Sequence, residues 1–352
     1  MLRAVAAGMV VVHHSIDILS NTFPGVHSVV VGAAGVDIFF VLSGVVIALS
    51  EHGRPPAPGG FLLRRIIRVW PMYWLALWLI GLGVIAGASP VGVQPVDGTI
   101  GNMLKSMFFI PFERAHGAIM PLLGVGWTLN YEMFFYLVFA LLIFLPDRVR
   151  ALALMGTMVV LALLGLALSP ENVVLSFFSN PILLEFAAGV GLAQLWIANW
   201  GAGRHDRVAG AALLALGVAG FVLMNSPEGF SQLMLSRVLV FGIPAVLCVA
   251  GAMLIERSGL SIKSRFWMEL GAASYVLYLF HSFVLQIVFK GGNAAGLQSL
   301  GPVAQVAAAI FAFVLAHLVA VFLHRRVEKP VTAMLNRIVG RQSDRLASSP
   351  VS

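Results

Sequence analysis

The chain has 352 residues, of which 59% are hydrophobic and only 11% are charged, and its net charge is +7. A soluble domain carries about 25% charged residues, so this composition excludes an ordinary soluble protein and indicates a membrane protein. The single cysteine, Cys248, excludes an internal disulfide and a cysteine-based metal site. The positive charge is typical of basic cytoplasmic loops in a membrane protein, so we expect no nucleic-acid partner.

Apolar runs recur along the whole chain, each near the roughly 20 residues that span hydrocarbon. Runs of this length form helices, because a helix satisfies its own backbone polar groups inside the bilayer. We therefore expect an all-α integral membrane protein with about ten transmembrane helices. The predicted spans are residues 2–20, 28–50, 69–87, 123–145, 150–168, 180–199, 208–224, 235–255, 268–290 and 302–324.

Basic residues are distributed unevenly over the connections. With the N-terminus in the cytoplasm, 18 of the 22 lysines and arginines fall in cytoplasmic segments. The positive-inside rule then predicts cytoplasmic N- and C-termini and a multi-pass protein of the cell (inner) membrane, in contact with membrane lipid. Residues 1–330 are expected to form the membrane domain, and 331–352 a mobile cytoplasmic tail.

Two connections differ from simple loops. Residues 51–68 begin as a Pro/Gly-rich coil and continue with arginines among bulky apolar residues, which predicts an interfacial helix leading into the third span. The outer loop, residues 88–122, contains MLKSMFFIPF. This piece is too short to span, so we expect it to lie at the interface or to re-enter the membrane.

The first predicted helix carries Arg3 near one end and the pair His13 and His14 deep inside. Eleven helical steps separate Arg3 from His14 and return to within about 20° of the start, so both lie on one face. Ionisable groups inside a membrane are functional candidates, and histidine is the usual general base near neutral pH. The alternatives are a positive-inside anchor for Arg3 and a packing histidine for His14.

Asp37 is the one carboxylate in the apolar run of residues 32–49. A carboxylate at this depth is paired, protonated or facing a wet cavity. It could serve catalysis, or it could be the structural partner of an arginine or histidine. Gly44 shares its helix face and would allow close approach of another helix, and Ser43 adds a hydroxyl.

Arg64, Arg65 and Arg68 lie three and four positions apart in FLLRRIIRVWPMYW, so they can point the same way at the cytoplasmic surface. Guanidinium groups suit phosphate oxygens, and attraction to anionic lipid is the alternative. In the fourth predicted span, Trp127, Asn130 and Glu132 follow one another closely. The aromatic residues there could form an interfacial belt, whereas Glu132 could accept a proton from a histidine.

Ser274, Tyr278 and His281 form one polar stripe on an apolar helix, which is expected to face the bundle interior. Whether the stripe is catalytic or structural stays open at this point. The single polar groups in other spans are interpreted as structural; these are His317, His324 and Glu185. Adjacent histidines do not have the helical spacing of metal ligands, and no metal motif occurs, so no metal is expected.

Six motifs together resemble the membrane acyltransferase-3 family, the integral-membrane O-acyltransferases that modify cell-surface polysaccharides. They occur in the family's order: LRAVAAGMVVVHHS, GVDIFFVLSG, FLLRRIIRVWPMYW, WTLNYEMFFYL, SYVLYLFH and VEKP at residues 327–330. The family's pattern of an arginine, ten residues and a histidine selects His14 and leaves His13 as an extra. Its Arg-x-x-Arg motif falls on Arg65 and Arg68, and its Trp and Glu fall on Trp127 and Glu132.

The resemblance implies ten spans, a cytoplasmic acyl-CoA donor and an extracytoplasmic or membrane-linked acceptor. We expect no additional soluble hydrolase-like domain, so the chain resembles the short type associated with exopolysaccharide or lipid-linked oligosaccharide modification. Family chains usually have several residues before the first motif, which begins here at Leu2. We therefore expect that the natural start lies upstream of Met1 and that an interfacial N-terminal segment precedes it.

These observations lead to one hypothesis for function: transfer of an acyl group, taken as acetyl, from acetyl-CoA to a saccharide hydroxyl. His14 would act as general base or transient acyl carrier, and Glu132 or Asp37 would fix its tautomer. Arg3, Arg65 and Arg68 would bind the CoA phosphates. Contacts to substrate are expected from Trp127, Asn130, Tyr278 and His281. The alternatives are a transporter that uses these intramembrane groups as a proton relay, and a non-catalytic assembly subunit.

Overall fold

The computed structural model describes residues 1–20, 30–199, 203, 205–223, 237–260 and 263–347. Within these residues the fold is helical without β-strands, and ten helices are long and apolar enough to cross a membrane. This confirms the predicted all-α membrane protein. The helices are α1 (Leu2–Ser20), α2 (Gly35–Ser50), α3 (Pro58–Ile85), α4 (Ile100–Met107), α5 (Trp127–Leu142), α6 (Asp147–Leu168), α7 (Val173–Phe178), α8 (Leu183–Ile197), α9 (Asp206–Leu223), α11 (Ile243–Arg257), α12 (Arg265–Ala294), α13 (Gly301–Leu323) and α14 (Lys329–Ala347).

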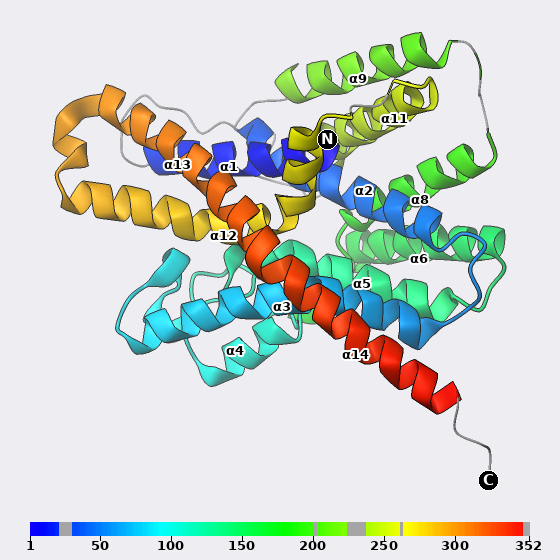
Figure 1. Ribbon diagram of the computed structural model, residues 1–352, viewed down its shortest axis with the longest axis horizontal. Coiled ribbons are helices and arrows are strands. Elements are labelled where there is room, and N and C mark those ends of the chain that lie inside the picture. Colours follow the sequence, from blue (N-terminus) through cyan, green and yellow to red (C-terminus); the bar gives the residue numbers. More distant parts are fainter. Residues whose placement is uncertain (21–29, 200–202, 204, 224–236, 261–262, 348–352) are drawn as a thin grey trace.

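Helix α2 lies at the centre of the bundle and packs on α1, α8 and α11 (Figure 1). Its contact with α8 is unusually close because two glycines face each other. A Cβ atom on Gly44 would lie 2.3 Å from the carbonyl oxygen of Phe186, and one on Gly189 would lie 2.1 Å from that of Val41. Small residues let membrane helices approach in this way, so the close approach predicted at Gly44 is confirmed.

The arginine-rich segment before the third span is helical, as the sequence predicts, and it is continuous with that span as the first half of α3. Its position at the membrane interface stays a prediction. The helix runs without a break through Pro71. A proline removes one backbone donor and frees the carbonyl four residues earlier, a defect that transmembrane helices tolerate. The first half of the predicted short apolar piece of the outer loop lies in α4. This helix is held to α3 by hydrogen bonds from the Tyr73 side chain to the Ser106 carbonyl oxygen and from the Trp74 side chain to the Met107 carbonyl oxygen.

Helices α13 and α14 form one long rod across the bundle, joined by a π-helical turn at His324–Glu328 (Figure 1). Most of the stretch from residue 331 is therefore helical, and the domain boundary at residue 330 stays a prediction. Glu328, from the VEKP motif, is buried, accepts a hydrogen bond from His324 (2.6 Å) and pairs with Arg68 (3.6 Å). The last motif of the chain is thus anchored to the arginine motif of α3.

Candidate active site

A cavity of about 300 Å³ opens between α1, the start of α5, α12 and Arg237, which lies at the start of the π-helical segment Val238–Gly242 before α11. We call it the chamber. Its polar lining comes from His13, His14, Trp127, Arg237, Tyr278 and Ser282. Its volume is at the lower end of the range for small-molecule sites, so it has room for a sugar-sized group. His14, the histidine that the sequence selects, borders this cavity.

His14 is held by a chain of hydrogen bonds that starts on α12. Nδ1 of His281 lies 3.1 Å from the carbonyl oxygen of Leu277, and Nε2 of His281 lies 3.2 Å from Nδ1 of His14. The same Nδ1 of His14 lies 3.0 Å from the carbonyl oxygen of Val10. His281 is fully buried, so this arrangement is shielded from exchange with water.

The hydrogen-bond chain fixes which nitrogen of each ring carries the proton. A carbonyl oxygen can only accept, so Nδ1 of His281 is the donor, and Nε2 of the neutral ring is left as an acceptor. Nδ1 of His14 must then carry its proton, because it faces two acceptors. The remaining Nε2 of a neutral His14 holds a free lone pair, which is the state that a general base requires.

His13 borders the same chamber but has a different partner. Its Nε2 lies 3.3 Å from a carboxylate oxygen of Asp17, one helical turn away. Nε2 is therefore paired in His13, whereas in His14 the same nitrogen is a free acceptor. The geometry favours His14 over its neighbour as the reactive group, as the helix-face argument predicts.

A second, smaller cavity of about 40 Å³ lies beside the chamber, and we call it the inner pocket. Arg3 and Glu132 both line it, together with Ser43, Thr128 and Tyr275. Arg3 donates from Nε to Ser274 (3.3 Å) and lies 5.6 Å from the ring centre of Phe39. Arg3 therefore points into the bundle and does not serve as an anchor at the lipid surface.

The inner pocket and the chamber share two lining residues, Val36 and Tyr278. The Tyr278 hydroxyl donates to the carbonyl oxygen of Val125 (2.8 Å) and lies 3.0 Å from the side-chain hydroxyl of Thr128. These residues stand between Arg3 and His14. A volume of 40 Å³ holds a water molecule but no pantetheine arm, so passage along this line requires side-chain movement here.

The two candidate carboxylates do not orient His14. Glu132 accepts hydrogen bonds from Ser43 (3.3 Å) and from Tyr136. Asp37 is fully buried and accepts two hydrogen bonds from Arg237, at 2.8 and 3.1 Å. The orienting role that the sequence assigns to Glu132 or Asp37 therefore falls to the Val10 carbonyl and His281. Asp37 instead has the structural role left open for it, as the partner of an arginine.

Arg237 is a charged residue of the chamber lining that the sequence does not single out. Its guanidinium carbon lies 5.7 Å from the ring centre of Trp127, and its Asp37 contacts fix one edge of the group. Behind this pair lies Glu185, buried at 1% exposure, whose two oxygens have no hydrogen-bond partner among the described residues. Arg237 could hardly be identified as a site residue from the sequence, because there it is only one of the charges assigned to the outer loops.

The arginines of α3 gather at the opposite end from the chamber. Arg65 donates to Ser50 (3.0 Å), lies 3.8 Å from Glu51 and covers the rings of Phe61 and Tyr136. Tyr136 in turn donates to Glu132, so the arginine motif connects with the inner pocket.

Of the four predicted substrate contacts, Trp127 and Tyr278 line the chamber, and His281 acts behind His14. Asn130 is buried away from both cavities, and its amide has no hydrogen-bond partner among the described residues. In the same described part of the chain, no three His, Cys, Asp or Glu side chains are grouped so that they could hold a metal ion.

The comparisons with known proteins decide the family. A family model described as "Acyltransferase domain" matches residues 1–325. The chain belongs to this acyltransferase-3 family. It is 36% identical over 273 residues to the Exopolysaccharide production protein ExoZ of Rhizobium meliloti (strain 1021), covering 77% of this chain and 82% of that protein. It is 24% identical over 338 residues to the Acyltransferase MdmB of Streptomyces mycarofaciens, covering 88% and 84%. No solved structure matches.

Membership makes the chain a membrane O-acyltransferase and removes the transporter and assembly-subunit alternatives. In this acyltransferase, segments that are far apart in sequence supply the chamber. The histidines lie 267 positions apart and the Asp37–Arg237 partners 200 apart. Helix packing alone brings them together.

The Asp37–Arg237 pair gives a stability prediction for the acyltransferase. Asp37→Ala leaves a buried guanidinium without its carboxylate, which should cost about 3–5 kcal/mol of unfolding free energy. Because Glu185 lies behind the pair, replacing all three by apolar residues, Asp37→Leu with Arg237→Met and Glu185→Leu, should restore most of that loss. Thermal unfolding of the purified protein in detergent measures both, with Glu171→Ala, an exposed carboxylate, as the unchanged control. A triple variant as unstable as Asp37→Ala would contradict the pairing.

Proposed function

We propose that this acyltransferase moves an acetyl group from cytoplasmic acetyl-CoA to a hydroxyl of a cell-surface or lipid-linked saccharide. The family supplies the reaction class, and the printed name of the ExoZ relative, an exopolysaccharide production protein, supports a saccharide acceptor. The strong positive-inside bias supports a cytoplasmic end for the arginines of α3, on the side where acetyl-CoA is made available.

The observation that carries the mechanism is the free Nε2 of His14 at the chamber. In our proposal this nitrogen removes the proton from the acceptor hydroxyl while the oxygen attacks the thioester carbonyl carbon. An oxygen–carbon bond forms, the carbon–sulfur bond breaks, and the CoA thiolate leaves with the proton from the His14 imidazolium. The Val10 carbonyl and His281 hold the ring in place through both transfers.

Arg237 is placed to stabilise the negative charge of this reaction. It shares the chamber with His14, and Asp37 fixes its orientation before substrate arrives. A preorganised cation in a water-poor site stabilises a developing oxyanion more strongly than water does. The same low water content limits hydrolysis of the thioester.

A covalent route uses the same residues in a different order. Nε2 of His14 would attack the thioester carbonyl and release CoA, and the acceptor hydroxyl would then take the acetyl group from His14. This order would allow the donor and the acceptor to occupy the chamber at different times. It suits a site whose two cavities are separated by the Tyr278 constriction.

For the donor, we propose that Arg65 and Arg68 bind the CoA phosphates and that the pantetheine arm runs inward past Arg3 and Glu132. Arg68 is half-exposed, so its donors can be reached from solvent. Arg65 and Arg68 contact Glu51 and Glu328 in the free protein. A bound phosphate would compete with these carboxylates for the guanidinium groups.

The function is tested by transfer of radiolabel from acetyl-CoA to an acceptor glycan by the purified protein. His14→Ala should lower the transfer rate by about 10²–10⁴-fold, the range for loss of a general base. His13→Ala is the matched control, because it removes the neighbouring imidazole from the same chamber, and it should keep most of the activity. Normal transfer by His14→Ala would contradict the mechanism.

The donor site is tested by binding of CoA to the double variant Arg65→Gln with Arg68→Gln. Each lost charge-assisted hydrogen bond is worth about 1.5–3 kcal/mol, so the dissociation constant should rise by at least about tenfold. Arg207→Gln, an exposed arginine at the start of α9, is the control. Unchanged CoA affinity in the double variant would remove the two arginines from the donor site.

A further inference from the structure

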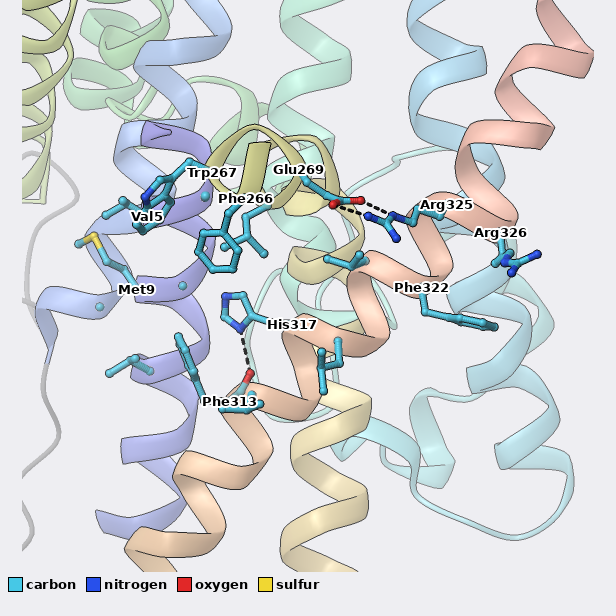
Figure 2. A pocket seen from close by; sticks show the side chains of 18 residues that line it. Val5, Met9, Phe266, Trp267, Glu269, Phe313, His317, Phe322, Arg325 and Arg326 are labelled. Carbon is cyan, nitrogen blue, oxygen red and sulfur yellow. Dashed lines mark hydrogen bonds and ion pairs between the residues drawn. The ribbon is translucent and has the colours of Figure 1, made fainter. Parts of the chain in front are cut away.

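A large groove of about 980 Å³ lies outside the catalytic region, between α1, the start of α12 and α13. Figure 2 shows Val5 and Met9 of α1 on one side, with His317 between Phe266 and Phe313. The groove shares no lining residue with the chamber or the inner pocket. Helix α1 therefore lines the chamber with one face and the groove with another.

The side of the groove opens toward the surroundings of the bundle. The exposed fractions are 63% for Leu318, 61% for Phe322 and 63% for Phe266, all large apolar side chains. The three helices that form the groove are membrane spans, so hydrocarbon surrounds them at this depth. An elongated apolar ligand can enter from the bilayer without crossing water.

His317 donates no hydrogen bond into the groove and contributes a single acceptor, its Nε2. Its Nδ1 lies 2.8 Å from the carbonyl oxygen of Phe313, so its N–H is satisfied within its own helix. The ring packs on that of Phe313 with centroids 4.3 Å apart. A Cβ on Gly8 of α1 would make ordinary van der Waals contact with both rings, at 3.8 and 3.9 Å, so α1 lies close to His317 and Phe313 at this level. A hydrocarbon chain in the groove would therefore lie on the outer side of this contact, along the exposed apolar side chains of α13.

One end of the groove is charged. Arg325 pairs with Glu269 there, and Arg326 lies beside them (Figure 2). This end is about 12 Å along the helix axis from His317. The π-helical turn His324–Glu328 brings two consecutive arginines to the groove lining. Such π turns are frequent at functional sites.

The charge at this end is positive. Glu269 balances Arg325, whereas Arg326 is exposed, and no carboxylate contacts it in the described part of the chain. Arg265 and Lys329 are further cations at the ends of the same helices. Basic groups at the end of a membrane span attract anionic headgroups.

We propose that this groove binds an anionic glycerophospholipid, with an acyl chain between α1 and α13 and the headgroup phosphate on Arg325 and Arg326. The apolar length, the lateral opening and the cationic end together match this one ligand. The proposal is independent of the acyl-transfer mechanism, since the chamber and the groove have separate linings.

Trp267 lines the groove and gives a direct readout. The full-length protein is reconstituted in vesicles of phosphatidylcholine with increasing fractions of phosphatidylglycerol brominated in its acyl chains, which quenches nearby tryptophan. The quenching of Trp267 is the difference between the wild type and Trp267→Phe. We expect half-maximal quenching at a several-fold lower fraction of the brominated anionic lipid than of brominated phosphatidylcholine.

Arg326→Gln should shift the half-maximal fraction upward by about fivefold, the effect of one basic residue near a membrane surface. Arg148→Gln, an exposed arginine at the start of α6, is the matched control and should leave it unchanged. Equal quenching by both lipids, or no shift in Arg326→Gln, would overturn the proposal. Relief of the quenching by a long-chain acyl-CoA would also overturn it, because the groove would then hold a donor.

Discussion

The arrangement of the active site depends on the hydrogen bond between Nε2 of His281 and Nδ1 of His14. Inside a membrane bundle an imidazole cannot rely on water, so each ring nitrogen must find a partner in the protein or remain an acceptor. The Leu277 carbonyl requires the proton of His281 to be on Nδ1, and the Val10 carbonyl together with His281 requires the proton of His14 to be on Nδ1 as well. The free nitrogen of His14 at the chamber follows from these contacts.

The same constraint organises the charges. Asp37 meets Arg237, Glu328 meets Arg68 and His324, and Glu51 meets the arginines at the start of α3. The Asp37–Arg237 and Glu328–Arg68 contacts join segments far apart in the sequence, whereas Glu328 and His324 are one helical turn apart and Glu51 meets arginines of the next helix. The contact between Glu328 and Arg68 joins two of the family's motifs. A motif residue can therefore matter for activity because it fixes another group. Asp37 illustrates this: it holds Arg237 at the chamber without contacting His14.

The spans were predictable because hydropathy and length are local properties, and the helix face shared by Arg3 and His14 follows from helical period alone. The close contact at Gly44 was predictable for the same reason. The helix that packs on each face was not predictable, because periodicity shows which residues share a helix face but does not show which other helix that face contacts. His281 therefore appeared as a substrate contact rather than the neighbour of His14, and Arg237 appeared only as a loop charge.

Other differences have equally physical causes. The sequence distinguishes an interfacial helix from the third span, whereas the structure has one continuous helix, α3, because a transmembrane helix tolerates the loss of the one hydrogen bond that Pro71 removes. Asn130 lies next to the motif residues in sequence, yet the helix turns it away from both cavities. Proximity along the chain is a poor guide to a site formed between helices.

The protonation of the His14 ring tests the central claim most directly. Nitrogen-15 chemical shifts of labelled histidine distinguish a protonated ring nitrogen from a free one, and loss of signals in His14→Gln, against His13→Gln, assigns them. The structure predicts that neutral His14 carries its proton on Nδ1 and has a free Nε2. A proton on Nε2, with Nδ1 free, would contradict the account of how the two histidines prepare the base.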